Sequence, residues 1–431
     1  MSCEAVSSGT LSLLRPPWID RWLVLSLDVQ FWTNIYSVDI TSNECLSKVR
    51  TLLSCPSKIA VARSFQGNEA QIFIDFLDRV LTQSCPDTKL RQRSLLLLSK
   101  ICKARTIIPS SYVLQKEFIS VGRVHYRGGF SDVSNGEYLG CPVAIKCLKV
   151  NEEDFDRVFK RLCREIIGWK HLSHPNILPL LGVSVLTDPH CFRILTEWMP
   201  NGNVMRYARS NPEANRLRLL SETASGVAYL HDLGVVHGDL KGANILVDNT
   251  GNAHVADFGL MTTIDLSTSI LSETVISSGG TVCWMSPELL DPPCFDSDGL
   301  PTRESDCYAL GMVIYEVLTG LRPFHHLRAF SPVPAVLRGE RPEEPLEAES
   351  LGFSFALWEL VQLCWSESSS TRPTARQLFD CLSSASLTWV PPRVYPVTKI
   401  ASRHHTRERC PSGSDSSGFV GVFLASSECE V

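Results

Sequence analysis

A lysine and a glutamate, nineteen positions apart, are residues that could together bind a phosphate group. Residues 143–146 read VAIK, which predicts an alternating strand that ends in Lys146. Glu165 falls in a predicted helix that continues to Leu172. A lysine that grips phosphate oxygens needs a carboxylate to hold its flexible stem, and Glu165 could supply one. Taken alone, Lys146 would usually be explained as a surface lysine on an edge strand.

A denser group of polar residues follows in the segment HGDLKGANIL, residues 237–246, and DFG begins eighteen residues after Asp239. The chain therefore resembles the eukaryotic protein kinases over about residues 113–389. It is similar in particular to the tyrosine-kinase-like group of serine/threonine kinases, in the form common in basidiomycete fungi. Six motifs agree in order and spacing: VAIK, the helix glutamate, HGDLKGAN, DFG, SPE in place of the usual APE, and DCYALG.

The resemblance implies transfer of the ATP γ-phosphoryl group to protein hydroxyls, and it gives five residues a catalytic role. Asp239 would accept the proton of the substrate hydroxyl, and Lys241 would neutralise charge on the γ-phosphate. Lys146 would contact the α- and β-phosphates, braced by Glu165. Thr281 would support Asp239 and Lys241. A lysine at position 241 accompanies serine/threonine specificity in the family.

The resemblance also implies Mg²⁺ as cofactor and ATP as co-substrate. Asp257, the aspartate of DFG, would hold a Mg²⁺ ion that bridges the phosphates. Asn244 would give a neutral oxygen to a second Mg²⁺, which suits a hard cation.

An adenine pocket is expected where residues 194–199 resemble the strand and hinge between two lobes. Thr196 falls at the gatekeeper position, and the backbones of Glu197 and Met199 would hydrogen-bond adenine. Apolar walls with a few placed polar groups are usual in such pockets. The remaining ATP contacts are expected from Gly128, Val133, Ala144, Lys146 and Leu246, of which Val133, Ala144 and Leu246 would sandwich the base.

Four further matches are structural. Glu288 is expected to pair with Arg372 as a buried bridge, and Asp306 and Gly311 match the aspartate and glycine of the central helix in the family.

The glycine-rich loop departs from the family pattern GxGxxGxV. Residues 126–133 read YRGGFSDV, so Gly128 is the only glycine in place. Tyr126 and Ser131 should stiffen this loop and weaken its grip on ATP, because glycine lets backbone N–H groups approach phosphate closely.

Gly238 is the second departure, since most of these kinases carry an arginine before the catalytic aspartate. That arginine anchors a phosphorylated activation-loop residue through charge-assisted hydrogen bonds. We therefore expect activity without activation-loop phosphorylation, although the segment has many hydroxyls: Thr262, Thr263, Ser267, Thr268, Ser269, Ser272 and Thr274.

Two other functions are open at this point. The degenerate loop favours a pseudokinase that acts as a scaffold or allosteric partner. Catalytically dead relatives commonly lose one of five polar residues that this chain retains, which opposes that function: Lys146, Glu165, Asp239, Asn244 and Asp257. A small-molecule kinase is disfavoured, because the SPE motif and Thr281 resemble a platform for protein substrates.

The elements that must position these residues predict an α+β fold with two lobes, and the resemblance implies that this is the bilobal protein kinase fold. Strand-like segments with glycine turns precede a helix at 152–172, strands return at 177–197, and helices dominate afterwards. Helices at 68–84, capped by Asn68, and at 87–105 predict a helical extension. The expected divisions are 1–40 unassigned, 41–110 helical extension, 111–389 kinase domain and 390–431 disordered tail.

The composition fits a soluble globular protein, with 44% hydrophobic and 20% charged residues among 431. A net charge of -5 argues against nucleic acid or anionic membrane as the main partner. The apolar run at 22–27 is too short for a membrane span or a signal peptide. We expect a cytoplasmic or nuclear protein, and the sequence indicates no oligomeric state.

Sixteen cysteines are scattered from Cys3 to Cys429, and no two have CxxC spacing. This pattern supports neither a zinc site nor a redox motif. Reduced and mostly buried thiols are therefore expected.

Overall fold

The structure is a computed structural model that describes most of the chain between residues 40 and 390. These residues belong to one compact unit, Met1–Arg393, and the second unit, Val394–Val431, contains none of them. The predicted tail and the unassigned segment 1–40 therefore lie almost wholly outside the described residues. The ranges described are 40–83, 87–127, 131–149, 155–187, 190–257, 262–263, 281–327, 332–345 and 348–390.

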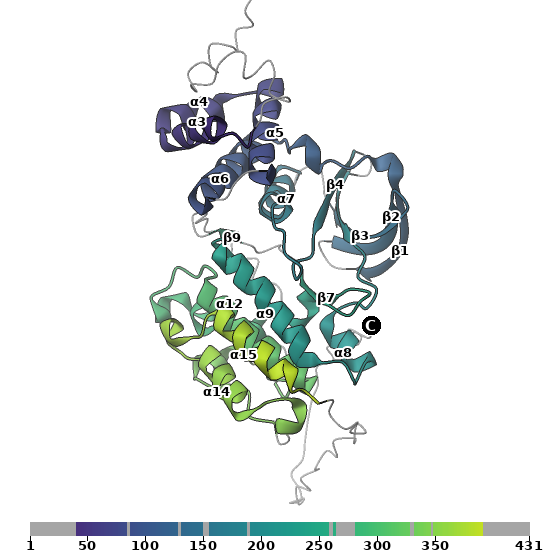
Figure 1. The fold of residues 1–431 in the computed structure, drawn as a ribbon, viewed down its shortest axis with the longest axis vertical. Coiled ribbons are helices and arrows are strands. Elements are labelled where there is room, and N and C mark those ends of the chain that lie inside the picture. The colour runs from purple at the N-terminus through teal and green to yellow at the C-terminus, as the bar shows by residue number, and fades with distance from the viewer. Residues whose placement is uncertain are drawn as a thin grey trace, which may run out of the picture. The chain divides into compact units, whose positions relative to one another are not determined.

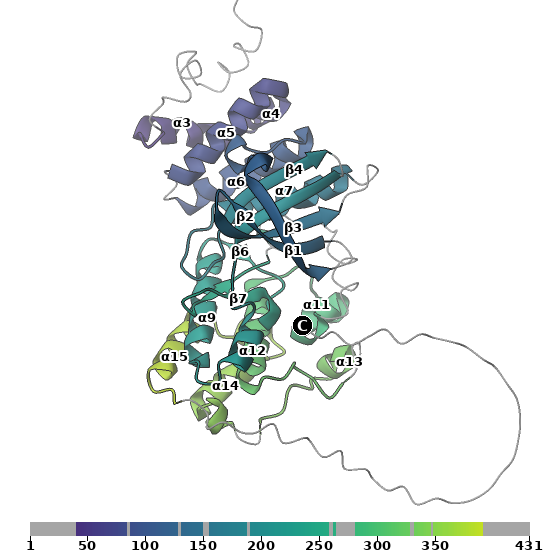
Figure 2. The same cartoon turned by 90° about the vertical axis from the view of Figure 1, so that its right-hand side faces the viewer.

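Five strands form one antiparallel sheet in the order β1-β2-β3-β5-β4 (Figure 2). Leu139 and Gly140 close the β2–β3 hairpin, and both have positive φ, as a two-residue type I′ turn requires. Helix α7 (Phe155–Lys170) packs beside β4 and lies inside the predicted range 152–172. The strands are β1 (Ile119–Arg127), β2 (Ser131–Tyr138), β3 (Cys141–Lys149), β4 (Leu180–Thr187) and β5 (His190–Glu197).

The part after β5 is mainly helical and is built around α12 (Arg303–Thr319), which is buried along almost its whole length. Gly311 lies in α12, where a Cβ atom would come within 2.6 Å of the Cys364 Cβ, so no larger residue fits without a shift. The other helices are α8 (Val204–Ser210), α9 (Arg216–Asp232), α11 (Pro287–Leu290), α13 (Pro332–Leu337), α14 (Phe355–Cys364) and α15 (Ala375–Leu387). Short strands pair as β6 (Val235–Val236) with β9 (Thr262–Thr263) and β7 (Ile245–Val247) with β8 (Ala253–Val255).

The five-stranded sheet with α7 and the mainly helical remainder confirm the predicted α+β fold with two lobes. Within the described ranges, no helix combines the length and the apolar character that crossing a membrane would need.

In the described part of the chain from residue 40 on, four helices precede the sheet (Figure 1): α3 (Asn43–Ser54), α4 (Pro56–Ser64), α5 (Gly67–Gln83) and α6 (Thr88–Arg105). The predicted helices at 68–84 and 87–105 are confirmed as α5 and α6. Asp87 caps α6, since its side chain accepts a hydrogen bond from the Lys89 N–H at 3.0 Å. The prediction that Asn68 caps α5 is wrong, because this helix already begins at Gly67.

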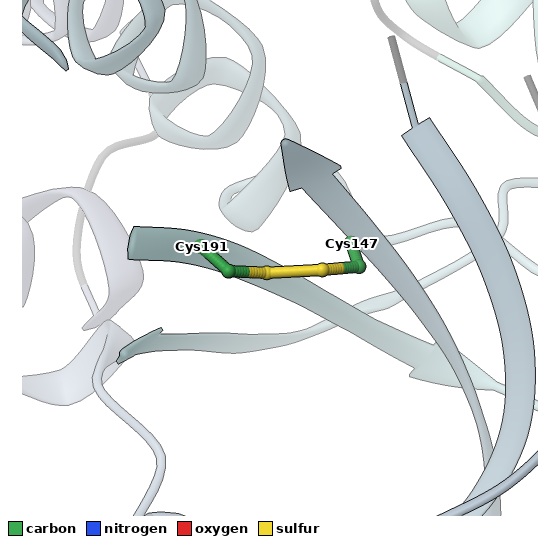
Figure 3. The surroundings of a disulfide bond; sticks show 2 residues. All are labelled: Cys147 and Cys191. Carbon is green, nitrogen blue, oxygen red and sulfur yellow. A yellow bond between two sulfur atoms is a disulfide. The ribbon is translucent and has the colours of Figure 1, made fainter. Parts of the chain in front are cut away.

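The expectation of reduced cysteines is wrong at one pair. Cys147 on β3 and Cys191 on β5 form a disulfide, with a Cα–Cα distance of 6.4 Å (Figure 3). The β3–β5 register sets Cys147 opposite Arg193 and Cys191 opposite Lys149, so the two cysteines are diagonal neighbours across the strands. Elsewhere in the described chain ten cysteines are free, and six of them are buried, as expected.

The predicted bridge between Glu288 and Arg372 is present and bidentate. The guanidinium donates to Glu288 Oε1 at 2.6 Å and to Oε2 at 2.8 Å, and the Arg372 side chain is 0% exposed. Burial alone would raise the pKa of Glu288, but the contact with Arg372 lowers it below its usual value. Arg372 also stacks over the Tyr308 ring, 5.2 Å from its centroid. The pair therefore joins α11 to α12 and to the segment before α15.

We predict that Arg372→Ala lowers the free energy of unfolding by about 3–5 kcal/mol, because it leaves the Glu288 carboxylate buried without its partner. Urea unfolding followed by circular dichroism measures this change. The control is Arg338→Ala, which breaks an exposed pair with Glu340 and should cost less than about 1 kcal/mol. Equal effects of the two substitutions would contradict the prediction.

Candidate active site

Three charged side chains from three separate elements meet where the sheet faces the helical part. Lys146 on β3 donates to Glu165 on α7 at 3.3 Å and to Asp257, just after β8, at 2.9 Å. Glu165 is 3% exposed, so its carboxylate is held away from water. The structure thus brings together residues that are 111 positions apart in the chain.

The pKa shifts in this group have an electrostatic origin. Burial alone would lower the pKa of Lys146, but the carboxylates of Glu165 and Asp257 raise it well above its usual value. Burial would raise the pKa of Asp257, and Lys146 lowers it below its usual value instead. At neutral pH the group therefore carries a full positive charge on Lys146 and a full negative charge on Asp257.

Asp257 has a backbone conformation that is uncommon for a residue with a side chain. Its φ is +62°, in the left-handed region that usually favours glycine. Such strain persists only where the surrounding structure enforces it, and it is typical of functional sites. It occurs at the residue that the sequence predicts as a metal ligand.

The segment around Asp239 holds one of its carboxylate oxygens and leaves the other free. Lys241 Nζ donates to Asp239 Oδ2 at 2.8 Å, and Asn244 Nδ2 donates to the same oxygen at 3.0 Å. Lys241 also donates to the Thr281 Oγ1 at 3.1 Å. Asp239 Oδ1 is buried and has no hydrogen-bond partner among the described residues. A buried acceptor without a donor is costly, so this oxygen is poised to accept a proton or a hydrogen bond.

Two carboxylates of α12 accept hydrogen bonds from the backbone of the segment around Asp239 and so hold it in place. Asp306 accepts the N–H groups of His237 at 2.8 Å and Gly238 at 2.9 Å. Glu316 accepts the Gly242 N–H at 2.8 Å and the Trp284 indole N–H at 3.0 Å. The sequence predicted Asp306 as structural and missed Glu316. A lone carboxylate among the apolar residues of this helix was the signal that could have found it.

The strand register places the predicted adenine-site residues on one face of the sheet. Ala144 and Lys146 share a face of β3, Thr196 on β5 pairs with Ala144, and Val133 on β2 pairs with Lys146. Val133 and Ala144 are half-buried, as expected of apolar walls that also face a cavity.

The segment after β5 brings the rest of the predicted adenine site to the lobe junction. Met199 is buried, and a β-bridge joins Asn203 to the half-buried Leu246 of β7. The Thr196 hydroxyl lies 3.4 Å from the Glu197 carbonyl oxygen. Gly128 lies outside the described residues, so its predicted contact with ATP stays a prediction.

The residues around Asp257 fit a small hard cation. In the described part of the chain no cluster of three or more His, Cys, Asp or Glu residues could hold a metal by itself. Mg²⁺ does not need one, since it usually takes one or two carboxylates and completes its shell with water and substrate phosphates. Asp257 offers a carboxylate, and Asn244 spends its Nδ2 on Asp239 and has an amide oxygen to offer.

The family model of protein tyrosine and serine/threonine kinases matches residues 119–382. This chain belongs to that kinase family. The match lies inside the predicted domain 111–389, whose boundaries stay predictions.

Named relatives of this kinase come from a plant and an amoeba. It is 29% identical over 290 residues to Serine/threonine-protein kinase STY46 of Arabidopsis thaliana, covering 65% of this chain and 47% of the relative. It is 31% identical to two Dictyostelium discoideum proteins, "Probable serine/threonine-protein kinase drkB" and "drkA". These matches cover 62% of this chain, and 37% and 39% of the relatives. The kinase thus spans less than half the length of each of these three curated relatives.

We predict that Glu316→Gln removes part of the pH dependence of stability. Burial raises the pKa of Glu316 to about 7, above the 4.5 usual for glutamate. The folded state therefore binds this proton more tightly than the unfolded chain does. The protonation of Glu316 therefore contributes its whole stabilisation of the folded state below pH 4.5, and this contribution is lost as the pH rises through about 7.

Urea unfolding between about pH 5 and about pH 8 measures this slope. The wild type should lose stability across that interval more steeply than Glu316→Gln, whose amide oxygen can still accept both N–H groups. Glu340→Gln, on the exposed surface, should keep the wild-type slope. Identical slopes for wild type and Glu316→Gln would contradict the prediction.

Proposed function

We propose that this kinase transfers the γ-phosphoryl group of ATP to serine or threonine hydroxyls of proteins. One observation carries the proposal: Asp239 has one oxygen held by Lys241 and Asn244, while its buried Oδ1 accepts no hydrogen bond from the residues that the structure describes. A general base must be fixed in place and still have a free acceptor for the proton that it removes. The arrangement around Asp239 meets both requirements.

The reaction moves one proton and one phosphoryl group. The substrate hydroxyl oxygen bonds to the γ-phosphorus while the bond from that phosphorus to the β–γ bridging oxygen breaks, and ADP leaves with that oxygen. The hydroxyl proton passes to Asp239 Oδ1. Lys241 lies between Asp239 and Thr281, where its charge can stabilise the transferring group. Mg²⁺, held by Asp257 and Asn244, would neutralise phosphate charge when bound.

The choice of serine and threonine over tyrosine rests on Lys241 and Thr281. Their 3.1 Å contact ties the catalytic segment to the segment before α11, which the family uses to receive protein substrates. The plant and amoebal relatives carry serine/threonine kinase names, which supports this choice. We propose as well that the kinase belongs to the tyrosine-kinase-like group in its basidiomycete form, and that it lies in the cytoplasm or the nucleus.

Activity without activation-loop phosphorylation is part of the proposal. Gly238 stands where an anchoring arginine would be, and its φ of +80° suits glycine, because a side chain there would be strained. Its N–H is already used by Asp306. A phosphate on the loop would find no guanidinium at this position.

We predict that Asp239→Asn lowers phosphate incorporation into a generic basic protein by about 10²-fold or more, because the amide cannot accept the proton. Purified protein with Mg²⁺-ATP gives the measurement. Asp232→Asn is the matched control: it makes the same change at an exposed site paired with Arg376, and it should keep wild-type activity. Absence of incorporation by the wild type, with stabilisation by ATP retained, would contradict the proposal in favour of a scaffold.

We also predict that alanine at seven of the hydroxyl residues between Asp257 and Glu288 leaves activity within about threefold, since no arginine at position 238 reads a phosphate. The protein should be compared before and after phosphatase treatment as well. Loss of about two orders of magnitude in either experiment would overturn the prediction. The set is Thr262, Thr263, Ser267, Thr268, Ser269, Ser272 and Thr274.

A further inference from the structure

Helix α7, which carries Glu165, is packed between the sheet and the helical extension (Figure 1). β4 covers one side of α7, and α6 covers another. Cys102 of α6 and Cys163 of α7 are both 0% exposed. They also lie close together, since the Cys163 thiol adds to burial in raising the pKa of Cys102. The extension therefore forms part of the core around α7.

A buried polar cluster joins the extension to the end of α7. His171 directly follows the last residue of α7, and its Nε2 shares a hydrogen bond of 3.0 Å with the Tyr112 Oη. The same nitrogen lies 3.2 Å from Asp78 Oδ1, a close approach without the geometry of a hydrogen bond. Ser111 donates to Asp78 Oδ2 at 2.6 Å. Burial would raise the pKa of Asp78, but its contacts with His171 and Ser111 lower it, so the carboxylate is charged at neutral pH. Arg91 of α6 donates to the backbone oxygen of His171.

Two further contacts anchor the extension and the residues that directly follow it, 111–114. The Leu114 N–H donates to the Val183 oxygen of β4 at 2.8 Å. Gln92 of α6 reaches the Leu233 oxygen at the end of α9, at 3.5 Å. The extension thus contacts the sheet, α7 and the helical lobe, and it can fix the end of α7 against both lobes.

Glu165 depends on α7 for its position. Among the described residues its carboxylate has one partner, Lys146, at 3.3 Å. His171 is six positions further along, less than two helical turns away, so a shift of the helix end moves Glu165 with it. Displacement by about 1 Å is enough to disrupt a catalytic geometry.

We propose that Asp78, Tyr112 and His171 are positioning residues for phosphoryl transfer. They lock the end of α7 to the helical extension, and this lock places Glu165 against Lys146. The proposal rests on the proposed kinase function for its activity readout only. It makes the extension, residues 41–110, together with Ser111 and Tyr112 that directly follow it, an internal part of the catalytic apparatus. The sequence indicated no definite role for the extension.

The test uses double-mutant cycles in the full-length protein, in which Tyr112→Phe and Asp78→Asn are each combined with Glu165→Gln. Tyr112→Phe keeps the buried ring and removes only the hydroxyl, so folding should be kept. Each variant should lower kcat/KM for ATP by about tenfold and leave KM for the protein substrate unchanged. In a Glu165→Gln background the same substitutions should cost nothing further, because they act through Glu165. Arg93→Ala, on an exposed part of α6, is the control and should match the wild type.

Hydrogen exchange gives a readout that needs no catalysis. In both variants the amides of α7 should exchange faster, while those of α9 and α12 keep their wild-type rates. Two results would overturn the positioning proposal. The first is that Tyr112→Phe and Asp78→Asn lower kcat/KM in the Glu165→Gln background by as much as they do in the wild type. The second is that hydrogen exchange in α7 is unchanged. A wild type without phosphate transfer would overturn the proposed function alone, and the exchange experiment would still decide on positioning.

Discussion

The ion contacts of Lys146 with Glu165 and Asp257 are the interaction on which the rest of the structure depends. The Lys146 cation and the Glu165 carboxylate are costly to remove from water, and they compensate one another only when the geometry is held closely. Asp257, whose side chain is 45% exposed, adds a second carboxylate. Each comes from a different element: a central strand, a helix packed on the sheet, and the turn after β8. The sheet register and the packing of α7 keep the Glu165 and Asp257 carboxylates within contact distance of Lys146.

The second requirement is to hold a catalytic segment that has almost no regular structure of its own. Strand β7 and a short 3-10 turn at Gly242–Asn244 cannot fix it alone. Asp306 and Glu316 instead accept its backbone N–H groups from α12, which is itself buried on all sides. Buried carboxylates placed on a rigid helix thus position a loop, and the loop positions Asp239. The chemistry lies on irregular backbone, while its precision comes from the helical core.

Much of the site could be predicted from the sequence, because the chemistry restricts the residue types and because the motifs keep their order. Lys146, Asp239, Lys241, Asn244 and Asp257 come together as the motifs implied. The features that could not be predicted depend on the register between strands that are far apart in the sequence, or on how a helix is rotated about its axis. The Cys147–Cys191 pairing follows from the β3–β5 register across 44 positions. The role of Glu316 depends on which way one face of α12 points. Helix α4 was missed because it buries only Ala62 and so has no apolar stripe.

The packing of α6 on α7 also bears on where this protein can be divided. The family match begins at residue 119, after the helices that cover α7. A fragment cut at that point would expose to water the face around Cys163, which is fully buried in the intact chain. Such a newly bared apolar surface favours self-association. We therefore expect a fragment that begins at residue 119 to self-associate more than the intact chain does, because the segment before it covers this apolar face.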